Sequence, residues 1–306
     1  MRISLDDASS DTCFVSHAHS DHTDAFRKGR KIIASEETFI LMGREPDKQA
    51  LPPSVKLFPA GHMLGARQLA AEGEKGKFVY TGDFSLHGSF TAPAAEILKC
   101  DTLMIDSTYC LPNYHFPKRG AVLKGMRDFV KLNEDSIVVF GAYTRGKSQE
   151  LAKFLNEECY VAPIVNAPAA KICAYYEKCG VKLDYIAAGT EEAEEAMKHP
   201  FVAIMPSSMV NFQFGASLSS AFGREAKTAV ATGWASVSKF PVDAAFPLSD
   251  HADFRDTMRY IYESGASKVI CANSNCENSA EYLRSIGINA VAKPDEKQAQ
   301  TTLAEC

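Results

Sequence analysis

Continuous apolar runs alternate with segments of helical character along most of the chain. Runs of this kind are typical of strands buried on both faces of a sheet, and the helices between them would cover those faces. The alternation predicts an α/β protein whose sheets are covered on both sides. The expected strands lie within 13–16, 76–85, 100–109, 199–208 and 227–236, strand–helix pairs within 31–43, 135–157 and 267–287, and a loop and helix within 247–265.

Polar residues mark the ends of several expected elements. Ser35 is expected to cap the helix within 31–43, and Ser249 or Asp250 to cap the helix within 247–265. Asp83 and Asp106 each follow an apolar strand, although Asp106 taken alone is equally consistent with a helix cap. Sites in α/β folds gather at such strand ends.

The composition is ordinary for a globular protein, with 46% hydrophobic and 23% charged residues. No apolar run approaches the roughly 20 residues of a membrane span, and the first ten residues lack the apolar core of a signal peptide. We therefore expect a cytoplasmic protein with no membrane partner. The net charge of −5 argues against a protein that coats nucleic acid, but it allows contact in a local groove. The polar segment 293–306 is expected to be frayed.

The stretch FVSHAHSDHTDAF places His17, His19, Asp21 and His22 within six positions. Imidazole and carboxylate are both zinc ligands, and four such groups rarely gather by chance. A spacing of two along an extended turn puts His17 and His19 on one side. The tight bend that follows puts Asp21 and His22 on the other side, so the cluster can serve two metal ions.

A two-metal site needs further ligands from elsewhere in the chain. His62, between two glycines, and Asp83 are the candidates, because both follow the cluster in order and small neighbours let the backbone approach a metal closely. His87, His115 and His199 stand alone and are expected to be ordinary surface side chains.

These motifs resemble those of a known family. The H-x-H-x-D-H cluster, GHMLGA and YTGDFS are similar to motifs of the metallo-β-lactamase superfamily. MIDSTYCLPNY and PLSDHADF resemble motifs of its β-CASP nucleases, and FGAYTRGKSQELAKFL resembles part of their inserted domain. LSDHADF, STYCLPNY and ATGWAS together are most similar to ligase-associated DNA exonucleases and mRNA 3′-end-processing-like exonucleases. The resemblance covers nearly the whole chain.

The resemblance implies an αββα sandwich interrupted by an inserted α/β domain. The metallo-β-lactamase domain would comprise residues 1–115 and 240–306, and the β-CASP domain residues 116–239. The inserted domain would close over the metals and leave a cleft between the two lobes. A narrow cleft admits single strands more readily than duplex.

The resemblance also implies two zinc sites, with manganese as another possible metal. Residues matching His17, His19 and His62 hold the first metal in the family, those matching Asp21 and His22 hold the second, and the residue matching Asp83 bridges them. Metal ions in such sites lie about 3.5–4 Å apart and lower the pKa of a water between them toward about 7.

Three residues match the family's catalytic positions. Asp21 matches the residue that orients the attacking hydroxide, His251 matches the general acid for the leaving oxygen, and Asp106 matches the acid that hydrogen-bonds this histidine. A carboxylate beside an imidazole fixes its tautomer and keeps it protonated near neutrality.

One position departs from the family's ribonucleases, which carry a further histidine after the strand corresponding to 267–272. No histidine follows His251 here, and Asn273 lies near the expected position. An amide oxygen is a poorer zinc ligand than imidazole, so we expect a weaker second metal with Asn273 as a weak contact to metal or phosphate. The DNA cross-link repair branch also lacks this histidine, which favours DNA.

The substrate groove is expected to use cations and hydroxyl groups. Arg145 and Lys147, at a glycine-rich turn that opens a helix, would bind phosphate, although a solvated turn is nearly as consistent with the pattern. Trp234 could stack on a base but is more typical of a core anchor. Further candidates for lining the cleft are Ser207, Ser208, Thr232 and Gly233. The basic run Arg27, Lys28, Arg30 and Lys31 could guide the phosphate backbone, but it is more typical of a solvated face.

The leading hypothesis is a metal-dependent phosphodiesterase acting on nucleic acid, with single-stranded DNA favoured over RNA. A β-CASP ribonuclease is the alternative, and a ligase or helicase would be a partner. A small-molecule metallo-hydrolase is disfavoured by the motifs around Asp106 and His251. A non-catalytic nuclease-like subunit is disfavoured by the intact ligand set.

Overall fold

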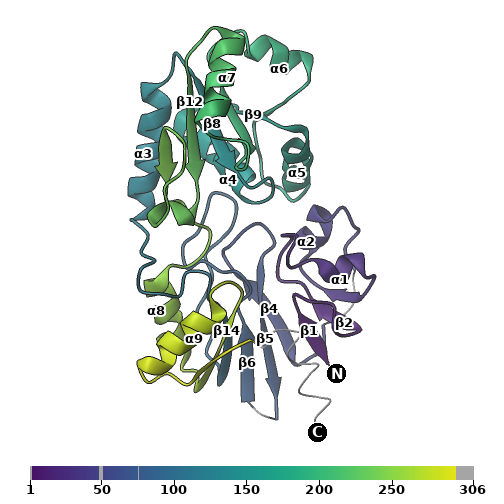
Figure 1. Ribbon diagram of the computed structural model, residues 1–306. Helices are drawn as coiled ribbons and strands as arrows, with labels where there is room; N and C mark the ends of the chain where they lie inside the picture. The colour runs from purple at the N-terminus through teal and green to yellow at the C-terminus, as the bar shows by residue number, and fades with distance from the viewer. Residues whose placement is uncertain (1, 48–50, 75, 294–306) are drawn as a thin grey trace.

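A computed structural model describes residues 2–47, 51–74 and 76–293 of the chain. Nearly all of the tail that was expected to be frayed, residues 294–306, lies outside these described residues. The described chain forms two lobes, and its first and last described segments, near residues 2 and 293, both belong to the larger one (Figure 1).

The larger lobe contains two sheets. A parallel three-stranded sheet has the order β1-β2-β3, and a mixed six-stranded sheet has the order β15-β14-β7-β6-β5-β4. The strands are β1 (Ile3–Leu5), β2 (Thr12–Phe14), β3 (Lys31–Ile33), β4 (Val55–Pro59), β5 (Arg67–Gly73), β6 (Gly76–Tyr80), β7 (Thr102–Asp106), β14 (Lys268–Ala272) and β15 (Ala290–Ala292).

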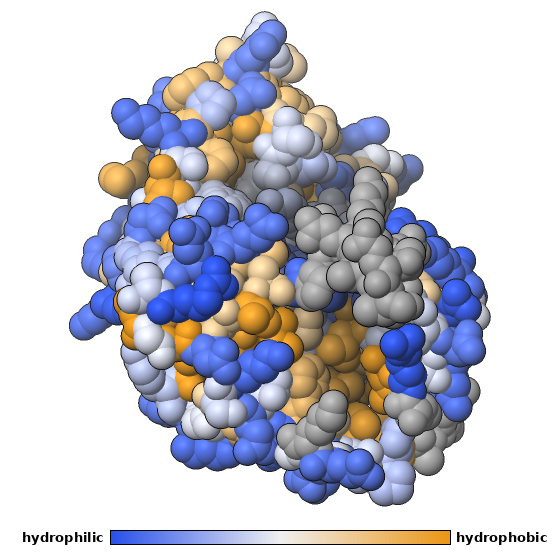
Figure 2. Space-filling model, turned by 60° about the horizontal axis from the view of Figure 1, so that its bottom comes forward, coloured by the Kyte–Doolittle hydropathy of each residue, from blue (hydrophilic) through white to orange (hydrophobic). Residues whose placement is uncertain are grey.

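The two sheets pack face to face through apolar side chains. Phe14 and Ile33 of the smaller sheet share a buried cluster with Leu69, Tyr80 and Met104 of the larger one. Figure 1 shows α1 (Asp24–Arg27) and α2 (Glu36–Leu41) outside the smaller sheet, and α8 (Phe254–Ser264) and α9 (Cys276–Ser285) outside the larger one. Figure 2 shows hydrophilic residues around the rim of this lobe and hydrophobic ones toward its middle. The expected αββα sandwich is confirmed.

The smaller lobe is built on a parallel sheet with the order β10-β9-β11-β8-β12-β13. Its last strand lies beyond the expected domain boundary at residue 239. The strands are β8 (Ile137–Ala142), β9 (Ile164–Val165), β10 (Ile186–Ala187), β11 (Val202–Pro206), β12 (Ala226–Ala231) and β13 (Ala244–Phe246). The helices are α3 (Arg119–Leu132), α4 (Lys147–Phe154), the π-helical turn η1 (Leu155–Cys159), α5 (Ala167–Lys178), α6 (Glu191–Ala196), α7 (Phe212–Phe222) and the 3-10 turn η2 (Gly233–Ser236).

One expected cap is confirmed and the other is wrong. The Ser35 hydroxyl accepts the Thr38 N–H at the start of α2. Helix α8 begins at Phe254, two residues later than expected, so its cap is Asp253, whose carboxylate accepts the Asp256 N–H. Ser249 and Asp250 lie too far upstream to cap this helix.

The candidate ligands lie at strand ends and in links between strands of the larger lobe. Asp106 is the last residue of β7, and Asn273 follows the neighbouring strand β14. The segments after β2 and β6, and the link between the antiparallel strands β4 and β5, carry the remaining candidate ligands. No helix among the described residues is both long and apolar enough to span a membrane.

Candidate metal centre

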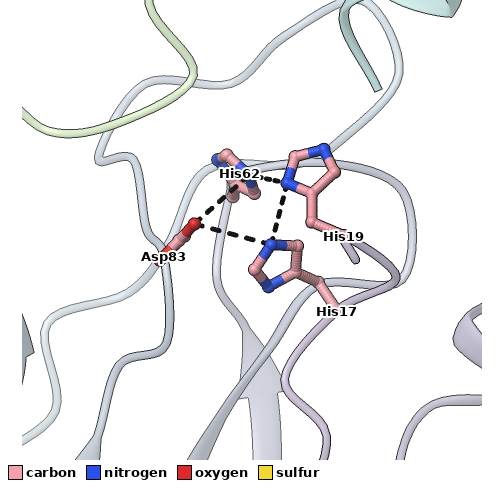
Figure 3. A group of neighbouring side chains, drawn as sticks. All are labelled: His17, His19, His62 and Asp83. Carbon is pink, nitrogen blue, oxygen red and sulfur yellow. Dashed lines mark hydrogen bonds and ion pairs between the residues drawn. The ribbon is translucent and has the colours of Figure 1, made fainter. Parts of the chain in front are cut away.

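Four side chains from three separate segments point at one another (Figure 3). His17 Nε2 lies 2.9 Å from His19 Nδ1, which lies 3.1 Å from His62 Nε2. The Asp83 Oδ2 atom lies 3.5 Å from His17 Nε2 and 3.7 Å from His62 Nε2. A tetrahedral zinc ion with bonds of about 2.0–2.1 Å requires ligand atoms about 3.4 Å apart, and the observed distances bracket this value. The four residues therefore fit one metal ion.

Hydrogen bonds behind the rings select the tautomer that a metal requires. His19 Nε2 donates to the Arg145 carbonyl at 3.1 Å, and His62 Nδ1 donates to the Asp250 carbonyl at 3.0 Å. Because a carbonyl can only accept, each ring carries its proton there and turns its lone pair toward the centre. His17 Nδ1 lies 2.9 Å from the Ser16 hydroxyl, which donates its own proton to Asp6 and therefore accepts from the ring.

Burial keeps these three imidazoles neutral. Desolvation, together with repulsion from neighbouring imidazolium charge, lowers the pKa of His17 and of His62 well below the usual value for histidine. Burial likewise lowers the pKa of His19 to about 4. Neutral imidazole is the form that binds a metal, so this group is ready to bind without losing protons.

A second group shares Asp83 with the first. His22 Nε2 lies 3.5 Å from Asp83 Oδ2 and 3.6 Å from Asp21 Oδ2. The Asp21 side chain is 78% exposed, which leaves this group open to the cleft. Burial alone would lower the pKa of His22, but the charges of Asp83 and Asp6 raise it to about 10. A metal ion here must therefore displace a proton, unlike one at the first group.

Asp6 belongs to this site, and the sequence analysis missed it. Its carboxylate accepts hydrogen bonds from His22 Nδ1 at 2.7 Å, from the Tyr80 hydroxyl at 2.8 Å and from both the amide and the hydroxyl of Ser16 at 2.6 Å. The residue has a φ of 56° directly after β1. The sequence analysis predicted no strand before Asp6, so the signal of an acid at a strand end, which pointed to Asp83 and Asp106, was missing here.

His251 and Asp106 form a pair at the edge of the centre. His251 Nδ1 lies 2.7 Å from Asp106 Oδ2, and His251 Nε2 lies 4.0 Å from Asp83 Oδ2. Burial alone would lower the pKa of His251, but the charges of Asp106 and Asp83 raise it to about 9. Asp106 also accepts hydrogen bonds from the amide and hydroxyl of Thr108, so it organises the local turn as well.

Asn273 lies beside the shared carboxylate. Its side-chain amide donates to Asp83 Oδ1 at 2.6 Å and approaches Asp106 Oδ1 at 3.3 Å. The structure therefore places Asn273 as a support for Asp83. Its role as a weak metal or phosphate contact stays a prediction.

A cavity of about 1510 Å³ between the lobes contains the metal centre. Arg145 and Lys147 also line it, as do Thr232, Gly233 and Trp234. Ser207 and Ser208 are not among its lining residues. They lie exposed on the turn after β11, where Ser207 N–H donates to the Ala142 carbonyl, so their expected place in the cleft is wrong.

Both expected phosphate-binding cations already have partners. Lys147 is 5% exposed and pairs with Glu150 at 2.6 Å and with Asp250. The Arg145 guanidinium donates to the Ala18 carbonyl. These contacts engage both side chains within the protein, and their role as phosphate contacts stays a prediction.

The basic run near the metal cluster lies at the surface. Arg27 and Lys28 pair with Asp24, and Arg30 pairs with Asp11, while Lys31 is exposed. These pairs are consistent with a solvated face, which was the alternative to a role in guiding the phosphate backbone.

Lys147 is the centre of a buried network that joins the lobes. Glu150, its partner in α4, also pairs with Arg119 at the start of α3, while Asp250 belongs to the segment that carries His251. The nearby cations lower the pKa of Glu150 to about 2, although burial alone would raise it. Because the Asp250 carbonyl accepts from His62, this network also positions a ligand of the first group. The sequence offered no signal for it beyond the charges themselves.

Similar proteins carry names from nucleic-acid metabolism. A "Probable DNA ligase" from Opitutus terrae is 31% identical over 94% of this chain and 29% of its own length. A DNA cross-link repair 1A protein from Mus musculus is 31% identical over 44% of this chain and 15% of its own length. An RNase J-like protein from Methanocaldococcus jannaschii is 25% identical over 60% of this chain and 52% of its own length. The chain thus spans about half or less of these relatives.

A solved structure shows a similar fold. The crystal structure of a protein of unknown function from Enterococcus faecalis V583 has a TM-score of 0.61 over 93% of this chain and 79% of that chain. Its sequence identity is 14%, so the likeness concerns the fold alone. No family model matches the sequence.

Proposed function

Because the chain belongs to the β-CASP nucleases of the metallo-β-lactamase fold, we propose that it is a metal-dependent phosphodiesterase that hydrolyses nucleic acid, with DNA preferred over RNA. One observation carries the proposal. Three buried imidazoles, a carboxylate common to two ligand groups and the His251–Asp106 pair lie together, and His19, His62, Asp83 and His251 of this set line one cleft. This set matches the needs of phosphodiester hydrolysis, which are a held water, a polarised phosphate and a proton for the leaving oxygen.

Each residue then has a defined task. His17, His19, His62 and Asp83 would hold the first metal, and Asp21, His22 and Asp83 the second. Bound metal ions would supply Lewis acidity and a water that ionises near neutral pH. Asp21, with its exposed carboxylate, would orient the attacking water.

The leaving oxygen needs a proton, and His251 provides it. His251 donates this proton from Nε2, while Asp106 accepts the Nδ1 proton and keeps the ring in that tautomer. Zinc is the proposed metal and manganese the substitute. The second metal is expected to bind more weakly for two reasons. Asn273 stands near the position where the family's ribonucleases carry a histidine ligand, and His22 must lose a proton before it can bind.

The names of several relatives favour DNA. These include DNA cross-link repair 1A proteins and the 5′ exonuclease Apollo of Gallus gallus. The match to one part of a probable DNA ligase supports a ligase as the working partner, and an exonuclease that prepares DNA ends fits that partnership. The helicase partner and the cytoplasmic location stay predictions from the sequence.

A ribonuclease is the second candidate function. The RNase J-like relative from Methanocaldococcus jannaschii favours it, with the lower identity of 25%. A direct comparison of 5′-labelled single-stranded DNA and RNA of the same sequence decides between the two.

The test pairs metal content with cleavage. Protein purified without added metal is analysed for bound metal and then incubated with both polymers, with and without zinc or manganese. We expect about one tightly bound metal per chain and cleavage of DNA once a second metal is supplied. Bound metal without cleavage of either polymer under any condition would refute the nuclease proposal.

A further inference from the structure

An aromatic group lines the cleft beside the metal centre, and neither the ligand set nor the acid–base pair uses it. Trp234 lies in η2, Tyr109 follows β7, and Tyr143 follows β8. All three line the same cavity as His62 and His251. We propose that Trp234, with Tyr143 as the second ring, stacks on an unpaired nucleobase next to the phosphate that is cut. This inference rests on the proposed nuclease function and specifies its substrate as a single-stranded end.

The location of Trp234 suits a base adjacent to the reacting phosphate. Its ring centroid lies 4.8 Å from that of Tyr109, and the Tyr109 centroid lies 5.7 Å from that of His251. One buried tyrosine ring therefore separates the indole from the proton donor. A nucleobase attached to the phosphate at the metal centre can reach the indole without a large bend of the strand.

Close packing around Gly233 holds the segment that carries the indole. A Cβ atom on Gly233 would lie 2.8 Å from the Tyr109 hydroxyl and 2.9 Å from the Ser249 hydroxyl, so a larger residue would force a neighbour to move. Glycine thus lets η2 lie directly against the segment that carries His251. Stacking is most favourable when the ring is held in advance, because less conformational entropy is lost on binding.

Trp234 is not enclosed as a core residue would be. It packs against Tyr109 and Tyr114 but keeps intermediate exposure, and its indole N–H has no hydrogen-bond partner among the described residues. A buried tryptophan usually finds such a partner. Tyr143 is 59% exposed and lines the cavity, so its ring is accessible to a ligand there.

Two cations that line the cleft already have partners. Lys147 pairs with two carboxylates and Arg145 donates to a carbonyl of the larger lobe, while Lys171 and Lys293 also line the cavity. Stacking on an aromatic ring adds affinity for an unpaired base to whatever these charges contribute. In a duplex the faces of each base are covered by the neighbouring base pairs, so Trp234 and Tyr143 can stack only on bases at an unpaired end.

Trp234 is the only tryptophan in the chain, so its fluorescence reports directly on this site. The experiment titrates the metal-loaded His251→Ala protein, which does not consume its ligand, with a thymidine oligonucleotide. The control is an abasic oligonucleotide of the same length and phosphate charge. We expect saturable quenching by the first and at least ten-fold weaker binding of the second. Equal quenching by both, or none by either, would overturn the stacking proposal.

Variants separate stacking from a structural role. The readout is kcat/KM for single-stranded DNA divided by kcat/KM for methyl p-nitrophenyl phosphate, which has no base. We expect Trp234→Ala to lower this ratio about ten-fold, mainly through KM, and Trp234→Phe to retain most of it. Tyr143→Ala, at an exposed position, should lower it severalfold even if Trp234→Ala folds poorly. An unchanged ratio in both Tyr143→Ala and Trp234→Ala would refute base stacking on these two rings. Failure of the wild type to cut any phosphodiester would instead refute the nuclease function, and the fluorescence titration would still test the stacking.

Discussion

Each histidine of the metal centre is oriented by a group behind it, and for His22 that group is Asp6. The His22 Nδ1 proton lies against a carboxylate that also accepts from Tyr80 and Ser16. An acceptor of this kind fixes the ring and raises its basicity as a ligand, and its loss typically costs 10–100-fold in metal affinity. Residues that never contact the metal thus contribute to its binding.

Asp6→Asn tests this role. The amide keeps the shape but cannot accept all of these hydrogen bonds, so we expect the second metal to bind about 10–100-fold more weakly while the first remains bound. Isothermal titration with zinc, starting from metal-free protein, measures both sites. Asp7→Asn, at the neighbouring and less buried carboxylate, is the matched control. Loss of the first metal, or an unaltered second site, would contradict the assignment.

His251→Ala separates binding from chemistry. The side chain lies beside the ligand groups but is not needed to complete the first one, so we expect normal content of the first metal. Removal of a general acid lowers turnover by about 10²–10⁴-fold. The comparison is kcat on single-stranded DNA with metal content measured on the same sample. Wild-type turnover in this variant would show that another group protonates the leaving oxygen.

At the scale of elements, Asp253 connects helix α8 to the loop before α3. Its carboxylate accepts the Asp256 N–H as a helix cap and also the Phe116 N–H at 3.1 Å. Asp253→Ala removes both acceptors, and we expect about 0.5–2 kcal/mol lower stability from the cap alone. Urea unfolding of the metal-loaded protein provides the measurement. Ser249→Ala, at the position expected from the sequence, serves as the comparison and should cost less.

The elements that could be predicted are those with a local signal. Continuous apolar runs identified β6 and β7, and Ser35 identified the start of α2. The candidate ligands could be named because the metal motifs occur in chain order. The start of α8 was missed because three polar residues, Ser249, Asp250 and Asp253, compete for the same cap. Burial of Lys147 and the reach of Asp6 to Tyr80 depend on contacts distant in sequence, for which a single sequence has no local signal.

At the scale of the whole molecule, a buried charge network between the lobes connects their relative position to the geometry of the metal centre. Lys147 and Glu150 belong to the smaller lobe, and Asp250 belongs to the segment that carries His251 in the larger one. Burial and the charge of Glu150 raise the pKa of Asp250, and Lys147 opposes this effect. The same segment supports His62 through its carbonyl, so the relative position of the lobes and the geometry of the metal centre are coupled.

Lys147→Met tests that coupling. The substitution keeps the volume but leaves two buried carboxylates with one fewer cation, and breaking a buried pair in this way costs about 3–5 kcal/mol. We expect lower stability and also weaker binding of the first metal, because the Asp250 carbonyl behind His62 shifts. Lys153→Met, which removes a more exposed pair with Glu157 from the same helix, is the control and should change neither quantity appreciably. Chemical denaturation and zinc titration on both variants give the two readouts. Destabilisation with unchanged affinity for the first metal would mean that the network holds the lobes together without positioning the ligand, and the coupling would then be wrong.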